Sequence, residues 1–197
     1  MKTYCKPAES NIESLDFIKE QVHLCFTGKR SKRRCQNLLV STGKITRAEL
    51  REEIRNCTCN KSLTAIDAVA EQAHADILAR SVSFEPVRQF QLRENGKLRN
   101  ICEESPWQQI FEYIAKGALA PLFRAKLLPI QYGSLPGKGQ IAGKRQNERI
   151  LRRMLHNKTD AAKCDVKKAY PSPTVECVMN LLRRDNGMNK TLLWLVE

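Results

Sequence analysis

The stretch Lys163-Cys164-Asp165-Val166-Lys167-Lys168-Ala169-Tyr170-Pro171-Ser172 decides how the rest of the chain is interpreted. A short apolar segment, 161–166, contains one acid near its end, and an aromatic residue follows five positions after that acid. The segment is typical of a buried strand, which would place Asp165 near a strand end. A carboxylate there suits Mg²⁺, because this hard ion prefers oxygen ligands. By itself, the pattern is at least as typical of a turn or a helix N-cap.

The charge of the chain points to a polyanionic partner. Its 197 residues include 34 Lys and Arg against 21 Asp and Glu, which gives a formal net charge of +13. A domain this basic usually meets nucleic acid. The plainer alternative is a solvated basic surface. The length suggests one large domain or two small ones, and the apolar content of 42% is ordinary for a globular protein.

The eight cysteines favour a reducing compartment over a disulfide framework. The first residues contain no apolar stretch of the kind found in signal peptides, and no segment approaches the length of a membrane span. We therefore expect a cytoplasmic protein without a membrane partner. The close pair Cys57-Thr58-Cys59 has neither the spacing nor the second pair of a zinc site, so no zinc is expected.

The helical spacing of apolar residues predicts helices over most of the chain. Thr46 and Glu49 have the spacing of a capping box, which predicts a short helix to about Arg55. Ser105-Pro106 predicts another helix start, and Pro121 is expected to end or kink that helix. The remaining predicted helices cover 12–26, 62–78, 140–155, 174–184 and 189–197, and Val175, Val178, Met179 and Leu182 are expected to face inward in the segment 174–184.

Between two of these helices the apolar period changes to two. Residues 87–93 alternate, Asn95-Gly96 is a strong signal for a two-residue hairpin turn, and 98–102 continue as the return strand. Lys97 and Arg99 therefore lie near the tip of one hairpin, where cations could approach a triphosphate. A surface hairpin with solvated charges is the alternative.

Two further groups of cations are candidates for nucleic-acid contact. The densest basic run could neutralise phosphates, act as a localisation-like patch, or be a solvated face; its cations are Lys29, Arg30, Lys32, Arg33 and Arg34. The predicted helix at 140–155 carries a stripe of like charges, which is unfavourable unless a polyanion covers it. This stripe contains Arg145, Arg149, Arg152 and Arg153.

Three segments occur in the order found in bacterial and phage reverse transcriptases. Asp165-Val166-Lys167-Lys168-Ala169-Tyr170 resembles the first catalytic palm motif of this family. The segment from Phe84 to Ile101 resembles its fingertip hairpin, and Gln131 to Gln140 resembles the glycine-rich turn between fingers and palm. The resemblance covers roughly residues 84 to 185, about half of the chain. It implies an α+β, helix-rich right-hand polymerase fold with fingers and a partial palm.

The resemblance also implies roles for individual residues. Asp165 and the Val166 carbonyl would hold Mg²⁺ or Mn²⁺, with Asp165 catalytic. Lys97 and Arg99 would bind the phosphates of a dNTP. Tyr170 would lie under the nucleotide sugar and exclude a 2′-hydroxyl, although an ordinary core aromatic stays an alternative. Lys138 of the glycine-rich turn would lie along the template–primer groove, unless that turn is a plain helix-capping loop.

The implied organisation is a basic helical extension over 1–60, fingers over 61–160 and the start of a palm over 161–197. The implied partners are an RNA template, a DNA or RNA primer, a dNTP and a cognate structured RNA. Two-metal catalysis needs a second carboxylate motif, a Tyr/Phe-x-Asp-Asp turn in this family, and the 197 residues contain none. We therefore expect a catalytically inactive amino-terminal fragment of a reverse transcriptase. The alternative is a non-catalytic basic module that binds nucleic acid.

Overall fold

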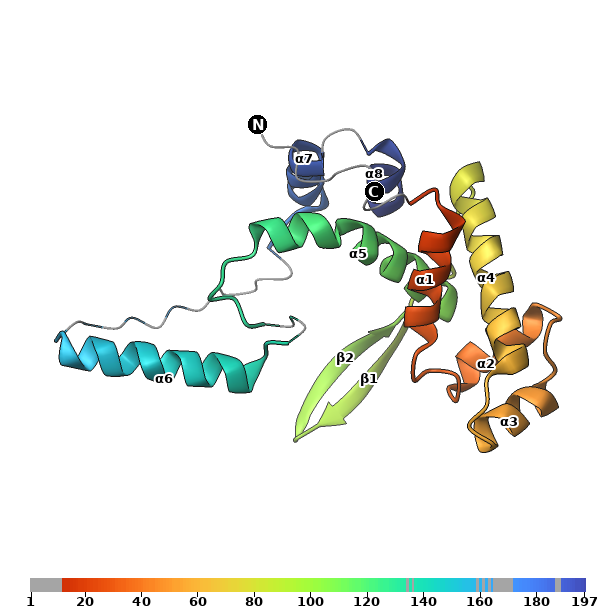
Figure 1. The fold of residues 1–197 in the computed structure, drawn as a ribbon, viewed down its shortest axis with the longest axis horizontal. Coiled ribbons are helices and arrows are strands. Elements are labelled where there is room, and N and C mark those ends of the chain that lie inside the picture. The colour runs from red at the N-terminus through yellow and green to blue at the C-terminus, as the bar shows by residue number, and fades with distance from the viewer. Residues whose placement is uncertain are drawn as a thin grey trace.

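The structure is a computed structural model that describes residues 12–133, 135, 137–158, 160, 162, 164, 172–186 and 189–197, with only the backbone at 185 and 186. These residues form an α+β arrangement of eight helices and one two-stranded sheet (Figure 1). The elements are α1 (Leu15–Phe26), α2 (Arg33–Ser41), α3 (Arg47–Arg55), α4 (Asn60–Ala79), β1 (Arg88–Glu94), β2 (Lys97–Glu103), α5 (Pro106–Lys126), α6 (Gln140–His156), α7 (Val175–Asn186) and α8 (Lys190–Val196).

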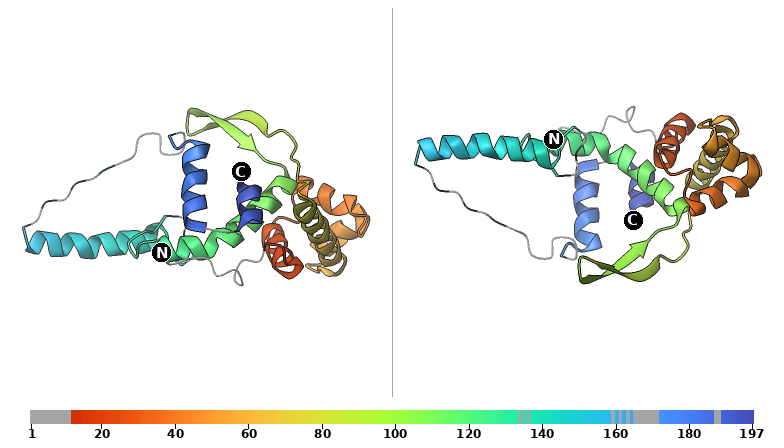
Figure 2. Two further views of the ribbon diagram at one scale, coloured as in Figure 1. Left: turned by 90° about the horizontal axis from the view of Figure 1, so that it is seen from above. Right: turned by 90° about the horizontal axis from the view of Figure 1, so that it is seen from below.

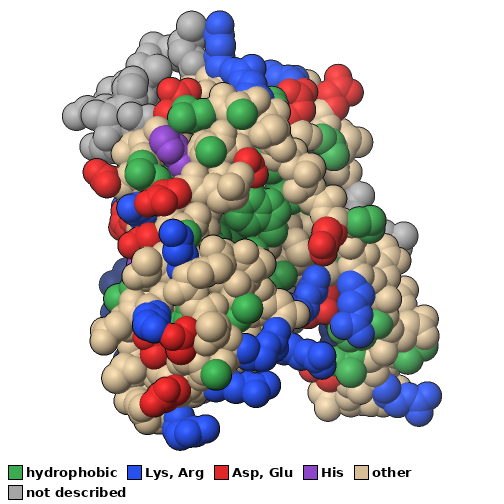
Figure 3. Space-filling view, turned by 90° about the vertical axis from the view of Figure 1, so that its right-hand side faces the viewer, with side chains coloured by type: hydrophobic (Ala, Val, Ile, Leu, Met, Phe, Trp, Pro, Cys, Tyr) green, Lys and Arg blue, Asp and Glu red, His purple; other side chains and the backbone are tan. Residues whose placement is uncertain are grey.

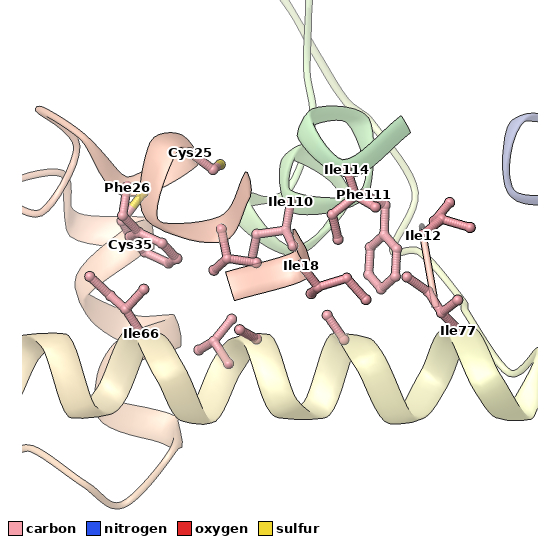
Figure 4. Packing of buried hydrophobic residues seen from close by; sticks show 14 of the residues in the cluster. Ile12, Ile18, Cys25, Phe26, Cys35, Ile66, Ile77, Ile110, Phe111 and Ile114 are labelled. Atoms are coloured by element: carbon pink, nitrogen blue, oxygen red, sulfur yellow. The ribbon is translucent and has the colours of Figure 1, made fainter. Parts of the chain in front are cut away.

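The hydrophobic core lies where α1, α4 and α5 meet. Figure 4 shows Ile66 and Ile77 of α4 facing Ile18 of α1, with Ile110 and Ile114 of α5 behind them. Each of these five side chains is at most 2% exposed. Fully burying a side chain of this size contributes about 1.5–3 kcal/mol, so this junction is a principal source of stability. Buried side chains of this one cluster come from all three sequence ranges expected as subdomains.

Helices α2 and α3 pack against α4. A side chain of α3 also caps the first turn of α4. Cys59 makes no side-chain hydrogen bond at the N-cap of α4. Instead, the carboxylate of Glu53 accepts hydrogen bonds from the backbone N–H groups of Lys61 at 2.6 Å and Ser62 at 3.0 Å. These donors have no partner within the helix. A side chain from a neighbouring helix thus takes the place of a local cap.

The two strands form an antiparallel hairpin that extends away from the helices (Figure 1). Its turn is Asn95-Gly96, whose φ angles are +50° and +77°. Both values are positive, as a type I′ turn requires, so the predicted hairpin is confirmed together with its turn. Every residue of β1 is exposed, and in β2 only Ile101 and Glu103 are partly covered.

The carboxyl-terminal helices pack less closely. Among the described side chains of α7, Met179 alone is buried, and α8 buries Leu192 against α5. The Arg80 guanidinium lies 5.8 Å from the Trp194 ring centroid, which links α8 to the end of α4. Figure 2 shows α6 standing apart from the helical core, and its one buried residue is Gly143.

The structure adds one helix to those predicted and corrects two of the positions expected to face inward. Helix α2 was not predicted, because it begins among basic residues without a side-chain cap. Pro121 was expected to end or kink α5, and the helix continues past it to Lys126. Val175 and Val178 were expected to face inward but are 71% and 44% exposed, since no described element packs over that side of α7.

Two of the described cysteines belong to the hydrophobic core. Cys25 and Cys35 are buried and unpaired, and burial raises the pKa of each thiol, as expected for small hydrophobic side chains. None of the helices in the described part of the chain is long and apolar enough to cross a membrane.

Candidate nucleotide and nucleic-acid interface

The hairpin presents two chemically different faces. Directly paired residues share a face, and successive residues of a strand alternate between faces. The register therefore defines an inner face, partly covered at Ile101 and Glu103, and a fully exposed outer face. The inner face consists of Arg88, Phe90, Leu92, Glu94, Lys97, Arg99, Ile101 and Glu103. The outer face consists of Gln89, Gln91, Arg93, Leu98, Asn100 and Cys102.

This register brings together the two residues predicted to bind nucleotide. Lys97 and Arg99 are two positions apart on β2, so both side chains lie on the inner face near the tip. Arg93 lies on the opposite face, although it is equally close to the turn. Two cations on one exposed face could contact the oxygens of a single triphosphate. Arg93 cannot contact the same triphosphate, because its side chain lies on the other face of the sheet.

Glu94 is the immediate partner of Arg99. The Arg99 Nε lies 3.0 Å from the Glu94 Oε2, and both side chains are more than half exposed. Lys97 lies directly opposite Glu94 in the register, with no ion pair of its own among the described residues. A triphosphate would have to displace Glu94 from Arg99. Exposed pairs of this kind are worth about 0–1 kcal/mol, so the displacement costs little.

Arg34 holds the base of the hairpin. Its Nη1 lies 3.2 Å from the Glu103 Oε2 and donates a hydrogen bond of 3.1 Å to the Glu104 carbonyl oxygen. Arg88 of β1 approaches the same Glu103 oxygen at 3.5 Å. An open cavity of about 610 Å³ adjoins this base and is lined in part by Arg34 and Trp107. Arg34 of α2 therefore helps to hold the hairpin in its orientation relative to the helices.

Three cations of the basic run make contacts within the protein and two do not in the described part of the chain. Arg34 contacts the base of the hairpin, as described above. The Lys29 Nζ donates a 3.1 Å hydrogen bond to Gln109 Oε1 and lies 4.8 Å from the Tyr113 ring centroid. Arg30 donates hydrogen bonds to the Thr58 carbonyl oxygen at 3.0 Å and to Ser62 Oγ, in the first turn of α4, at 2.9 Å. The other two cations, Lys32 and Arg33, are exposed and make no ion pair in the described part of the chain.

Acidic and basic side chains are interspersed over the face shown in Figure 3, which includes α2, α3 and α4. One example is the ion pair between Lys61 and Glu49. Mixed charges at short range screen each other's field. Part of the positive charge on the α2–α4 side is therefore balanced by acids nearby.

Helix α6 has the opposite character. Lys144 lies 4.0 Å from Glu148, whereas Arg145, Arg149 and Arg152 are exposed and have no ion-pair partner in the described residues. These three arginines are three or four positions apart and therefore follow one side of the helix. We call them the cationic stripe. They span about 10 Å along the axis.

The turn that precedes α6 is held by Lys138. Its Nζ donates a hydrogen bond of 3.0 Å to the Pro129 carbonyl and lies 5.4 Å from the Tyr132 ring centroid. A Cβ at Gly143 would be 3.3 Å from the Tyr132 side chain, so this glycine allows Tyr132 to lie close to α6. Lys138 thus has a local structural contact besides its predicted role toward nucleic acid.

The predicted catalytic residue Asp165 and the predicted nucleotide-binding residues Val166 and Tyr170 lie outside the described residues. Within the described ranges, no group of three or more His, Cys, Asp or Glu side chains could hold a metal ion.

Sequence reasoning missed two positions that shape this interface, Glu94 and the hairpin-bracing role of Arg34. Glu94 had a usable signal. A two-residue turn places Glu94 opposite Lys97 and diagonal to Arg99, within reach of a long side chain. The contact between Arg34 and Glu103 had no such signal, because 69 positions separate them in the chain.

Comparison of the chain with protein-family models, with curated proteins and with solved structures gave no match.

Proposed function

We propose that this chain contains the fingers and the first part of the palm of an RNA-directed DNA polymerase. The observation that carries the proposal is the hairpin tip, where Lys97 and Arg99 share the exposed inner face. Preorganised cations are what a transferring phosphoryl group needs, because its negative charge must be stabilised as the bond to the leaving group breaks. The collinear resemblance to the palm motif and the glycine-rich turn supports the same assignment.

Each residue has a separate part in this proposal. Lys97 and Arg99 bind the triphosphate, and Tyr170 packs at the sugar and selects a deoxynucleotide. Asp165 and the Val166 carbonyl oxygen hold Mg²⁺ or Mn²⁺, which supplies neutralisation of phosphate charge. The cationic stripe of α6 binds the backbone of the template–primer. Primer extension by these 197 residues is not expected, because the second carboxylate motif is absent from the sequence.

The test is equilibrium binding of a dNTP in the presence of Mg²⁺. Arg99→Ala and Lys97→Ala should each weaken binding about tenfold or more, since each removes a charge-assisted contact worth about 1.5–3 kcal/mol. Arg93→Ala is the matched control, because it removes the same charge from the opposite face of the same tip. Equal losses in all three variants would mean that general charge, and not a nucleotide site, explains the binding.

Two further variants connect this test to the palm. Asp165→Asn should abolish the Mg²⁺ dependence of dNTP binding. Tyr170→Ala should allow a ribonucleotide to bind nearly as well as the corresponding deoxynucleotide. If the wild-type chain binds ribonucleotide and deoxynucleotide equally, the DNA polymerase assignment is wrong.

A second candidate function is a non-catalytic module that binds nucleic acid. The cationic stripe favours it, because its three arginines make no ion pair in the described part of the chain and need no catalytic site to explain them. This alternative predicts tight, salt-dependent RNA binding and no dNTP binding. The Arg99→Ala and Asp165→Asn variants would then leave every measured affinity unchanged.

A further inference from the structure

The outer face of the hairpin differs from the inner face in composition. It carries three side-chain amides, one arginine and no acid, and all six of its residues are exposed. The inner face carries two acids, each in an ion pair with an arginine. The outer face therefore presents unneutralised hydrogen-bonding groups to solvent.

The amides are partly ordered by each other. Gln91 Nε2 donates a hydrogen bond of 3.1 Å to Asn100 Oδ1 across the two strands. This contact leaves the Gln91 Oε1 acceptor and the Asn100 amide donors outside the hydrogen bond. Carboxamides offer a donor and an acceptor side by side, which matches the edge of a nucleobase. Gln89 adds another amide on the same face, two positions before Gln91.

We propose that the outer face binds a single-stranded nucleic acid, with Gln91 and Asn100 at base edges and Arg93 at a phosphate. The identification of this strand as the template rests on the proposed function. Base edges are accessible to such amides when the strand is unpaired. Leu98, which is 59% exposed beside Arg93, supplies an apolar surface for a base.

The distribution of charge distinguishes a single strand from a duplex. A ribbon that enters a duplex groove needs cations on both sides, because it must contact the phosphates of two backbones. The outer face has a single cation, and it lies at the tip. One strand that crosses the ribbon from the tip toward its base can use that cation and both amides together.

The first experiment measures fluorescence anisotropy of short single-stranded oligoribonucleotides of uniform base. Arg93→Ala should weaken binding by about threefold to tenfold for every base and reduce the slope of log affinity against log salt by about one. The double variant Gln91→Ala/Asn100→Ala should reduce the differences in affinity among the four bases. Wild-type affinities and base preferences in both variants would overturn the proposal.

The second experiment uses Cys102, an exposed thiol on the outer face. In a variant that keeps Cys102 and the buried Cys25 and Cys35 and has serine at the other cysteine positions, a single-stranded oligonucleotide should slow alkylation of Cys102 severalfold. The positions to replace are Cys5, Cys57, Cys59, Cys164 and Cys177. An unchanged rate, or equal protection by a duplex of the same sequence, would refute the assignment to single strands.

The outcomes for strand and nucleotide binding separate the two proposals. Arg93→Ala should leave Mg²⁺-dependent dNTP binding at the wild-type value, whereas Arg99→Ala should weaken it. Protection of Cys102 without any dNTP binding would support the strand surface and contradict the polymerase. Binding of dNTP that depends on Arg99, without protection of Cys102, would support the polymerase and contradict the strand surface.

Discussion

Substituting Gly117 by alanine tests the packing of α1 against α5. A Cβ at this position would lie 2.4 Å from Oε1 and 2.5 Å from Cδ of Gln21, whose side chain is 8% exposed. Such distances are too short for non-bonded atoms, so the Gln21 side chain would have to move within a packed core. Overpacking of this kind costs about 1–3 kcal/mol.

A second effect acts in the other direction. Alanine is favoured over glycine in a helix interior by about 1 kcal/mol. Gly117→Ala should therefore change the free energy of unfolding by between about zero and a loss of 2 kcal/mol. In a Gln21→Ala background the steric conflict is gone, and the same substitution should stabilise the protein by up to about 1 kcal/mol.

The assay is urea unfolding followed by circular dichroism for the wild type, both single variants and the double variant. The coupling between Gln21 and Gly117 should favour the double variant by about 1–3 kcal/mol. The reasoning is refuted if Gly117→Ala has the same effect with and without Gln21. That result would mean that α1 and α5 are not in close contact at this crossing.

Three further predictions concern the charged contacts. Hydrogen bonds from Lys61 and then from the Thr46 backbone and hydroxyl lower the pKa of Glu49 to about 2. Glu49→Gln should therefore reduce the loss of stability between about pH 5 and 2, measured as the urea midpoint at each pH, with Glu52→Gln as the control. Arg34→Ala should speed hydrogen exchange of the hairpin amides, whereas Arg33→Ala should not, because Arg33 makes no contact with Glu103. Replacing the cationic stripe with glutamine should reduce the slope of log RNA affinity against log salt by about 2 to 3.

The sign of the Glu49 prediction follows from proton linkage. The folded carboxyl has a lower pKa than the unfolded one, so the unfolded chain binds more protons as the pH falls. The stabilisation is complete above the unfolded pKa of about 4.3 and disappears as the pH decreases toward 2. The difference between wild type and Glu49→Gln isolates this group from the other carboxylates.

Local signals predicted the parts of the fold that depend on neighbours in the chain. The capping box forms as expected, with Thr46 Oγ1 accepting a 3.3 Å hydrogen bond from the Glu49 backbone N–H, and the Glu49 carboxylate accepting one of 2.8 Å from the Thr46 N–H. The Asn95-Gly96 turn likewise fixed the hairpin register. That register placed Lys97 and Arg99 on one face, which sequence alternation alone could indicate.

Contacts between distant residues were beyond such reasoning. Glu53 caps α4 from the preceding helix, so the start of α4 at Asn60 had no local sign. Leu63 and Leu78 fit the helical spacing but are 40% and 57% exposed, because α1 covers only the stripe that includes Ile66. The helical period identifies candidate positions, and the neighbouring helix decides which of them are buried.

The same distinction applies to charge, and it changes where nucleic acid should be sought. The density of Lys and Arg along the sequence is highest at 29–34, yet three cations there are occupied by hydrogen bonds within the protein. Freeing them for phosphate would break the connections of α1 and α2 to α4, α5 and the hairpin. In the described part of the chain, the cationic stripe of α6 and Lys97 and Arg93 at the hairpin tip make no such contacts, so they can bind phosphate without that loss. We therefore expect α6 to contribute more to phosphate binding than the basic run at 29–34. Substitutions that remove charge from α6 should weaken RNA binding more than those that remove charge from 29–34.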